Sequence, residues 1–78
     1  MRVKVKLPKL GLTIEEATVR EWLKKEGDEV AAGEVIATIE ADKATFEIPA
    51  PASGRIVEIL ASVDDTVEVG ANIAIIEA

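Results

Sequence analysis

The residues best placed to do chemistry lie in one short segment, Glu40-Ala41-Asp42-Lys43-Ala44. If its flanks pair across a two-residue loop, Lys43 lies at the exposed tip of a β-hairpin. A lysine amine on its flexible four-carbon stem is a group that enzymes modify covalently. Most hairpin lysines, however, are ordinary solvated turn residues, and the local pattern taken alone favours that interpretation. The position of this amine, rather than its charge, is the feature that the surrounding sequence specifies.

The flanks of this segment alternate between apolar and polar residues. The apolar pairs predicted across the hairpin are Ala41 with Ala44, Ile39 with Phe46 and Ala37 with Ile48; the polar pairs are Glu40 with Thr45 and Thr38 with Glu47. A slip of one residue would turn the apolar set outward, so this register is strongly specified. The loop lacks the Gly or Asn-Gly that primed turns favour. We therefore predict a type I turn with Asp42 and Lys43 as its central residues.

An internal repeat accompanies the hairpin, because residues 19 to 41 align with residues 56 to 78 at a constant offset of 37. Ten of the 23 aligned positions are identical: Glu21/Glu58, Leu23/Leu60, Asp28/Asp65, Val30/Val67, Gly33/Gly70, Ile36/Ile73, Ala37/Ala74, Ile39/Ile76, Glu40/Glu77 and Ala41/Ala78. The repeated unit is a strand, a turn and another strand, and two such units are expected to pack face to face. The second copy stops at Ala78, the counterpart of Ala41, and has no second Asp-Lys.

Composition argues against several classes of function. The chain has 78 residues, one small domain over residues 1 to 78, with a net charge of −6 and neither Cys nor His. No basic stripe is present to neutralise phosphates, so we expect no nucleic-acid binding. The missing thiols and imidazoles remove zinc sites and the usual nucleophile and general base, so we expect no independent catalysis and no metal. No apolar run or leader suggests a membrane span, which favours the cytoplasm or, in a eukaryote, the mitochondrial matrix.

The rest of the chain predicts short strands only. Residues 3 to 7 alternate as a half-buried strand that ends at Pro8. Residues 14 to 26 include helix-favouring types, but their counterpart at 56 to 60 is β-branched, so both are predicted as strands. Bulges near Arg20-Glu21 and Val57-Glu58 would explain their imperfect alternation. The natural total is eight strands in two sheets, with the first and last strands together, away from Lys43.

A wider set of residues supports a specific family. They are Leu7-Pro8-Lys9-Leu10-Gly11, Glu16-Ala17, Val19, Trp22, Gly27-Asp28-Glu29-Val30, Gly33, Ile39-Glu40-Ala41-Asp42-Lys43-Ala44, Ala50-Pro51 and Gly54. This ordered set, which extends over nearly the whole chain, resembles the lipoyl domain of 2-oxo acid dehydrogenase complexes. The resemblance implies an all-β fold: a flattened barrel or sandwich of two four-stranded antiparallel sheets with quasi-twofold symmetry.

The resemblance also implies a function. Lys43 would be amide-linked to lipoate, with Asp42 and Ala44 as the turn residues that present it to the lipoylating enzyme. Gly11 and the loop through Thr13 would lie beside the tip and contribute to recognition by the decarboxylase. The partners would be a thiamine-diphosphate 2-oxo acid decarboxylase, the acyltransferase core and dihydrolipoamide dehydrogenase. The domain would be monomeric when isolated, and part of a longer acyltransferase (dihydrolipoyl transacylase) subunit.

Three other functions use a related architecture. A biotin carrier also modifies a hairpin lysine, but methionines typically flank that lysine, whereas Asp42 and Ala44 flank Lys43. The glycine-cleavage carrier is lipoylated but longer. An unmodified lipoyl-like adaptor module would need no modified lysine at all. The adduct on Lys43, which is lipoate, biotin or none, distinguishes these classes.

Several structural expectations follow from the repeat. The predicted core consists of Val19, Val30, Ile36, Ile39, Ile56, Val67, Ile73 and Ile76, with Phe46 added from the hairpin. Trp22 is expected to pack rather than bind, because its counterpart is Ile59. The five glycines are interpreted first as turn residues. Asp64 stands where the first copy has Gly27, so we expect it to adopt a positive φ.

Overall fold

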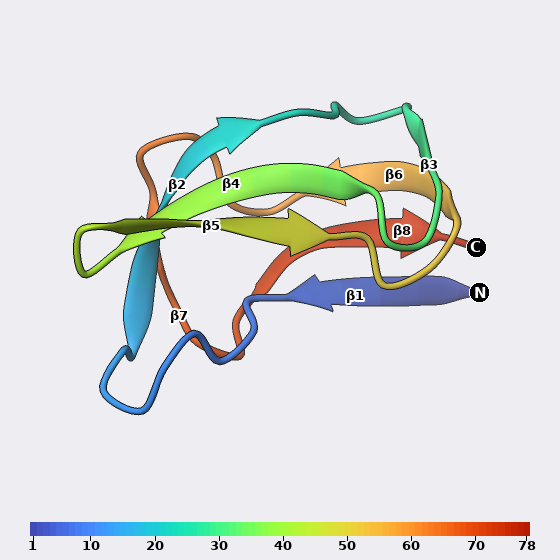
Figure 1. The fold of residues 1–78 in the computed structure, drawn as a ribbon. Helices are drawn as coiled ribbons and strands as arrows, with labels where there is room; N and C mark the ends of the chain where they lie inside the picture. The colour runs from blue at the N-terminus through green and yellow to red at the C-terminus, as the bar shows by residue number, and fades with distance from the viewer.

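A computed structural model describes all 78 residues and contains eight strands (Figure 1). They are β1 (Arg2–Lys6), β2 (Glu16–Trp22), β3 (Glu29–Val30), β4 (Val35–Ala41), β5 (Ala44–Pro49), β6 (Gly54–Ile59), β7 (Thr66–Glu68) and β8 (Asn72–Glu77). The segment that could be mistaken for a helix is indeed the strand β2. No helix long and apolar enough to cross a membrane is present.

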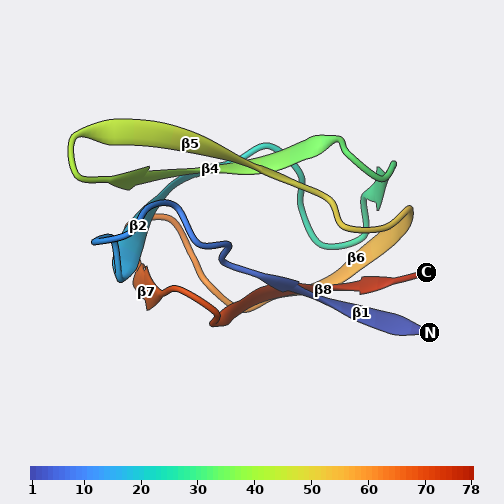
Figure 2. The same cartoon turned by 60° about the horizontal axis from the view of Figure 1, so that its bottom comes forward.

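The strands form two antiparallel sheets that face each other as two layers (Figure 2). One sheet has the order β1-β8-β6-β3 and the other β5-β4-β2-β7. The offset of 37 residues relates β2, β3 and β4 to β6, β7 and β8, and each of these pairs occupies equivalent places in opposite sheets. The predicted sandwich with quasi-twofold symmetry is confirmed.

Backbone hydrogen bonds repeat the symmetry in detail. The amide of Val19 donates to the carbonyl of Asp65, and that of Ile56 donates to Asp28, both at 2.9 Å. The symmetry also extends to β1, which the predicted repeat did not include. Gly33 donates to Ala50 and Gly70 donates to Leu7, both at 2.8 Å. Strand β1 is therefore the counterpart of β5, and it pairs with β8 as β5 pairs with β4.

Both predicted bulges are present. The register of β2 against β4 shifts between Val19 and Glu21, and that of β6 against β8 shifts between Ile56 and Glu58. A bulge inserts one extra residue, which changes the face to which the following side chains point. This is why the apolar positions in the two copies do not alternate strictly.

The core lies between the two sheets and contains sixteen buried residues, all apolar. Seven of the nine predicted core residues are among them. Val67 on β7 and Phe46 on β5 are only partly buried and pack against the core from outside it. The prediction omitted Leu7, which is 1% exposed. Leu7 follows the last residue of β1. The prediction missed it because the aligned repeat, residues 19 to 41 and 56 to 78, does not include β1.

Asp64 and Gly54 differ in how they compare with the expectations for turn residues. Asp64 has a φ of 76°, as predicted from its correspondence to Gly27. Gly54, however, lies at the start of β6 and not in a turn. A Cβ on Gly54 would overlap the carbonyl oxygen of Glu77 and lie 2.9 Å from its carbonyl carbon. Glycine is required at this position by close backbone approach rather than by φ.

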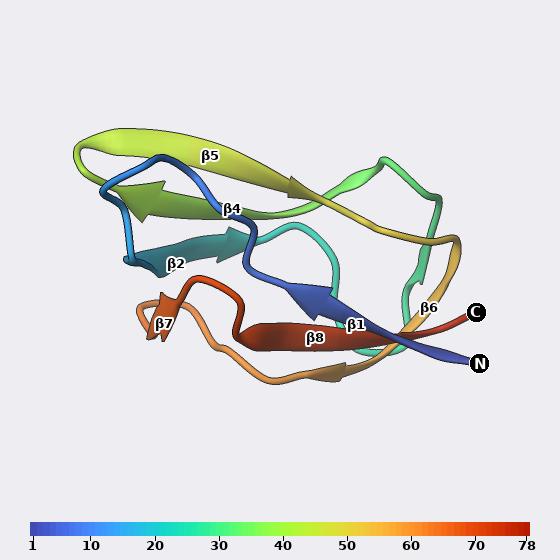
Figure 3. The same ribbon diagram turned by 90° about the horizontal axis from the view of Figure 1, so that it is seen from below.

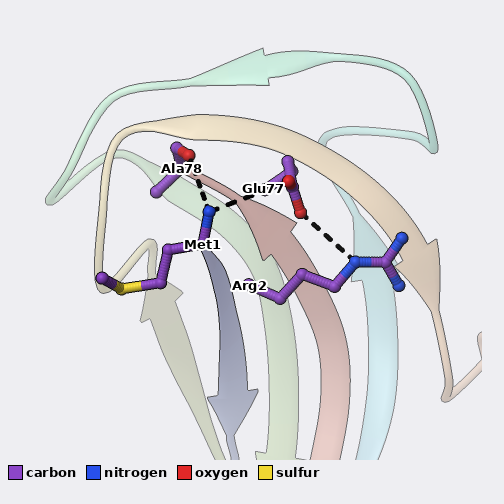
Figure 4. Close-up of polar contacts among 4 residues, drawn as sticks. All are labelled: Met1, Arg2, Glu77 and Ala78. Carbon is purple, nitrogen blue, oxygen red and sulfur yellow. Dashed lines mark hydrogen bonds and ion pairs between the residues drawn. The ribbon is translucent and has the colours of Figure 1, made fainter.

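The two chain ends meet at the end of the molecule away from the β4–β5 turn (Figure 1). The amide of Ala78 donates to the carbonyl of Met1 at 2.8 Å. Next to this pair, the Arg2 Nε lies 3.2 Å from a Glu77 carboxylate oxygen (Figure 4). The first and last strands therefore lie together and away from Lys43, as expected.

Candidate functional site

The β4–β5 hairpin presents the predicted site. Its observed register pairs Ala41 with Ala44, Glu40 with Thr45, Ile39 with Phe46, Thr38 with Glu47 and Ala37 with Ile48. All five predicted pairs are confirmed. Ile39 is 0% exposed and Ile48 is 1% exposed, whereas Glu40 and Glu47 are exposed on the outer face. The tip is therefore held in place by a core that extends along the inner face of both arms.

The turn at the tip differs from the type I geometry that we predicted. Asp42 has a φ of 47° and Lys43 a φ of 64°, so both central residues are left-handed, as in a type I′ turn. That prediction was wrong because it weighed residue preference above strand twist. Primed turns match the right-handed twist of a two-residue hairpin, whereas a type I turn would splay its arms. Asp tolerates this conformation, but Lys adopts it at an energetic cost.

Lys43 is fully displayed by this arrangement. Asp42, Lys43 and Ala44 are exposed, whereas Ala41 is only 7% exposed. Lys43 takes part in none of the four ion pairs of the structure. Its amine is therefore free to react. The side chain begins from a backbone that the neighbouring Ala41–Ala44 pair fixes.

The connection between β1 and β2 passes close to the tip (Figure 3). Its residues Gly11, Leu12 and Thr13 line one depression together with Asp42. The predicted neighbourhood of Gly11 and the tip is thus present. Gly11 has no positive φ, and an added Cβ would make only an ordinary contact with Ile14, so neither the backbone conformation nor the available space requires glycine there. Leu12, which sequence reasoning did not single out, is 93% exposed at this loop.

Comparison with known proteins agrees with this geometry. The model of the biotin and lipoyl attachment family, described as "Biotin-requiring enzyme", matches residues 3–76. The solved structure of the lipoyl domain of the 2-oxoglutarate dehydrogenase complex from Azotobacter vinelandii has a TM-score of 0.79 against this chain. It covers 97% of this chain and 96% of that one at 36% identity. This chain belongs to that family as a lipoyl domain.

Two curated relatives extend the comparison. The lipoyl domain is 44% identical, over its full length, to part of the dihydrolipoyllysine-residue succinyltransferase component of the 2-oxoglutarate dehydrogenase complex of Bartonella vinsonii subsp. berkhoffii. It is 50% identical, over 90% of its length, to part of the acetyltransferase component of the pyruvate dehydrogenase complex of Corynebacterium glutamicum. The chain spans only 19% and 10% of the lengths of these two proteins. Domains of this kind are carriers in 2-oxo acid dehydrogenase complexes and have no active site of their own.

A second depression of the lipoyl domain, of about 410 Å³, contains Lys43 itself. Thr18 on β2 and Thr66 on β7 line it, with their hydroxyl oxygens 3.2 Å apart. Sequence reasoning missed these two residues as candidates. Their only signal was that each occupies an outward position of a strand, and 48 residues separate them in the chain.

Charges around the tip are mostly acidic. Glu40 has one cationic neighbour, because an Arg20 guanidinium nitrogen lies 3.8 Å from its carboxylate. Both side chains are about half exposed, so this pair contributes little to folding. Asp42 and Glu47 take part in no ion pair. The lipoyl domain therefore presents its lysine within a surface of uncompensated carboxylates.

Trp22 has the packing role that its counterpart Ile59 suggested. The ring is partly buried against the core, and its Nε1 donates a hydrogen bond of 2.7 Å to the carbonyl of Ala61. This bond joins the end of β2 to the segment that follows β6. A tryptophan satisfied in this way stabilises the contact between the two halves of the lipoyl domain.

Proposed function

We propose that Lys43 carries lipoate in amide linkage and that the domain is a swinging-arm acyl carrier within an acyltransferase subunit. The observation that supports this most is the amine itself: it is exposed, free of ion pairs and located at the apex of a two-residue turn. Amide formation joins the Lys43 Nζ to the lipoate carboxyl carbon with net loss of water. The lipoylating enzyme supplies the activation, because this chain has no residues that could.

The residues at the tip suit that group. An extended attachment needs a protein surface that does not compete for the amine, and Lys43 is exposed and forms no salt bridge. Lys43 would hold lipoate, which would supply a disulfide open to reductive acylation by a thiamine-diphosphate 2-oxo acid decarboxylase. The resulting thioester would be the acyl donor to coenzyme A at the acyltransferase core, and the dithiol left behind would be the substrate of dihydrolipoamide dehydrogenase. The chain contributes reach and orientation.

The neighbours of Lys43 have distinct proposed roles. Asp42 adopts the first left-handed position at little cost and so allows lysine to occupy the second. Ala44 is small, which leaves the amine accessible to an enzyme that must surround the turn. Gly11 lies in the β1–β2 loop, which lines one depression together with Asp42. In this position the loop, with the exposed Leu12, would meet a decarboxylase that receives the lysine arm.

Biotin is the alternative group, since the family model includes biotin-dependent proteins. Lys43 is flanked by Asp42 and Ala44. These neighbours favour lipoate, because biotin carriers typically have methionines at both flanking positions. The test offers the domain to a lipoate–protein ligase and to a biotin–protein ligase in separate reactions. We expect the mass of one lipoyl group in the first and no adduct in the second.

The carrier role has a separate test. The lipoylated domain is mixed with a 2-oxo acid decarboxylase, its thiamine diphosphate and the 2-oxo acid, and acyl transfer is followed by intact mass. We expect one acyl group per lipoylated domain and none on Lys43→Arg, which keeps the charge but accepts no lipoate from the ligase. Acylation of the Lys43→Arg variant, or a lipoylated wild type that no decarboxylase acylates, would contradict the proposal.

A further inference from the structure

Two rows of outward-facing side chains cross the two sheets at equivalent places. The tip row, next to the Lys43 turn, consists of Thr45, Glu40, Thr18 and Thr66 on β5, β4, β2 and β7. The opposite row, next to the paired chain ends, consists of Arg2, Glu77, Arg55 and Glu29 on β1, β8, β6 and β3. Each row places one residue of every strand in its sheet side by side.

The quasi-twofold symmetry relates the two rows position by position. At the offset of 37 residues, Glu40 aligns with Glu77 and Thr18 aligns with Arg55. The shared glutamate is therefore the only side chain common to both rows. Around it, the opposite row alternates positive and negative charges, with Arg2 in contact with Glu77 (Figure 4). The tip row surrounds its glutamate with hydroxyl groups instead.

This difference decides which row a partner protein can cover. Covering the opposite row would remove four charged groups from water, and such desolvation is costly even for paired charges. The tip row itself has a single charged side chain, Glu40, which has Arg20 as its cationic neighbour at 3.8 Å. The hydroxyls of Thr18 and Thr66 already contact each other at 3.2 Å. The centres of protein interfaces are correspondingly poor in charged residues. The tip row is thus a surface that another protein can cover at low cost.

The tip row is also continuous with the reactive amine. Glu40, Thr18 and Thr66 line the same depression of about 410 Å³ as Lys43. An enzyme that takes Lys43 into its active site is therefore within reach of this face. Carboxylates border the depression at Glu16 and Asp42, so a complementary partner presents cationic side chains at its rim.

We propose that the tip row is the docking surface for the enzyme that attaches lipoate to Lys43. Uncharged hydrogen-bonding groups of that enzyme contact Thr18 and Thr66, and its cationic side chains face the carboxylates around them. The inference deepens the proposed function and rests on it.

The test exchanges the chemistry of the two rows without changing net charge. In the double variant Thr18→Arg with Thr66→Glu, each threonine is replaced by the residue at the equivalent position of the opposite row, which is Arg55 for Thr18 and Glu29 for Thr66. The control, Arg55→Thr with Glu29→Thr, makes the reverse exchange away from the tip. Initial rates of lipoylation by a lipoate–protein ligase with lipoate and ATP are measured by intact mass over a range of domain concentrations. Thermal unfolding of each variant checks its fold.

We expect kcat/KM of the tip-row variant to fall about tenfold or more, the effect of about 1.4 kcal/mol in binding, mainly through KM. The control should react at the wild-type rate. If the double variant does not fold, the single variant Thr66→Glu, on the short edge strand β7, replaces it. Its kcat/KM for lipoylation should also fall. Equal kcat/KM for wild type and folded tip-row variants would overturn the docking surface alone. A wild type that gains no lipoyl group would overturn the proposed function as well.

Discussion

Asp42 and Lys43 are consecutive residues that both have left-handed backbone dihedrals, with φ of 47° and 64°. The second of these positions is the one where type I′ turns favour glycine. A lysine there costs stability that a glycine would not. The backbone conformation of Lys43 therefore lowers the stability of the hairpin at the residue proposed to carry the cofactor. Backbone strain of this kind is commonly found at functional residues.

That relationship predicts different effects on stability for two substitutions at one position. Lys43→Gly should raise the free energy of unfolding by about 0.5–1 kcal/mol, because it removes the Cβ from a left-handed position. Lys43→Ala retains the Cβ and buries nothing new, so it should change stability by less than about 0.5 kcal/mol. Both should abolish lipoylation. Urea unfolding of the three proteins is the measurement, and a glycine variant less stable than the alanine variant would contradict the strain argument.

The second prediction concerns the two counterparts Ile39 and Ile76, both fully buried. Truncation of either one to Ala should cost about 2–5 kcal/mol, through lost transfer free energy and the cavity left behind. A loss of this size is a large fraction of the stability of a small domain. Denaturant unfolding measures it. Near-zero cost at both positions would refute a core built from the paired repeat.

The third prediction tests the close approach at Gly54. Gly54→Ala should destabilise the domain by about 1–3 kcal/mol, since the new methyl group can be accommodated only if β6 moves away from the Glu77 carbonyl of β8. Gly11→Ala is the matched control. A Cβ there would lie at 3.4 Å from the Ile14 Cδ1, an ordinary contact with a flexible side chain. Similar melting temperatures for the two variants would argue against this role of Gly54.

The fourth prediction concerns the pH dependence of stability. A hydrogen bond from the Ala31 amide, followed by the hydrogen bond and charge of Lys24, holds the pKa of Glu34 below its ordinary value of 4.5. Since the folded-state pKa is lowered, the contribution of Glu34 to stability is present above the unfolded-state pKa. It is lost as the pH falls through the folded-state pKa.

Glu34→Gln should therefore be less stable than wild type near neutral pH, and the difference should shrink as the pH falls below about 4.5, the ordinary carboxyl pKa. Urea midpoints at a series of pH values measure it. Glu47→Gln is the control, because Glu47 takes part in no ion pair. A destabilisation by Glu34→Gln that is the same at acid and neutral pH would exclude the Lys24 contact as its cause.

The sequence allowed much of the fold to be predicted, because local pattern and internal repeat agreed. The hairpin register followed from alternation around Ile39 and Phe46, and the bulge near Arg20 followed from comparison with residues 56 to 60. The turn type could not be read in the same way. It depends on the twist of the paired arms, which overrides the preference of Lys43 for a right-handed backbone.

Features that depend on distant pairings were missed for a related reason. The contact of Thr18 with Thr66 requires β2 to pair with β7 across 48 residues, and nothing local marks either threonine. Similarly, Gly54 resembled a turn glycine because it follows Pro51, Ala52 and Ser53. Only the position of Glu77 across the sheet shows why a side chain is excluded there.

The most direct test of the central claim is peptide-level mass spectrometry of the lipoylation reaction. The chain has six lysines, and we expect a single lipoyl group on Lys43 and none on the other five. In the charge-neutral exchange Asp42→Lys with Lys43→Asp, the amine leaves the apex position and points in another direction, so no adduct should form. A lipoyl group on any other lysine of the wild type, or modification of the exchanged variant at the wild-type rate, would contradict the account of Lys43 as the residue that this hairpin positions.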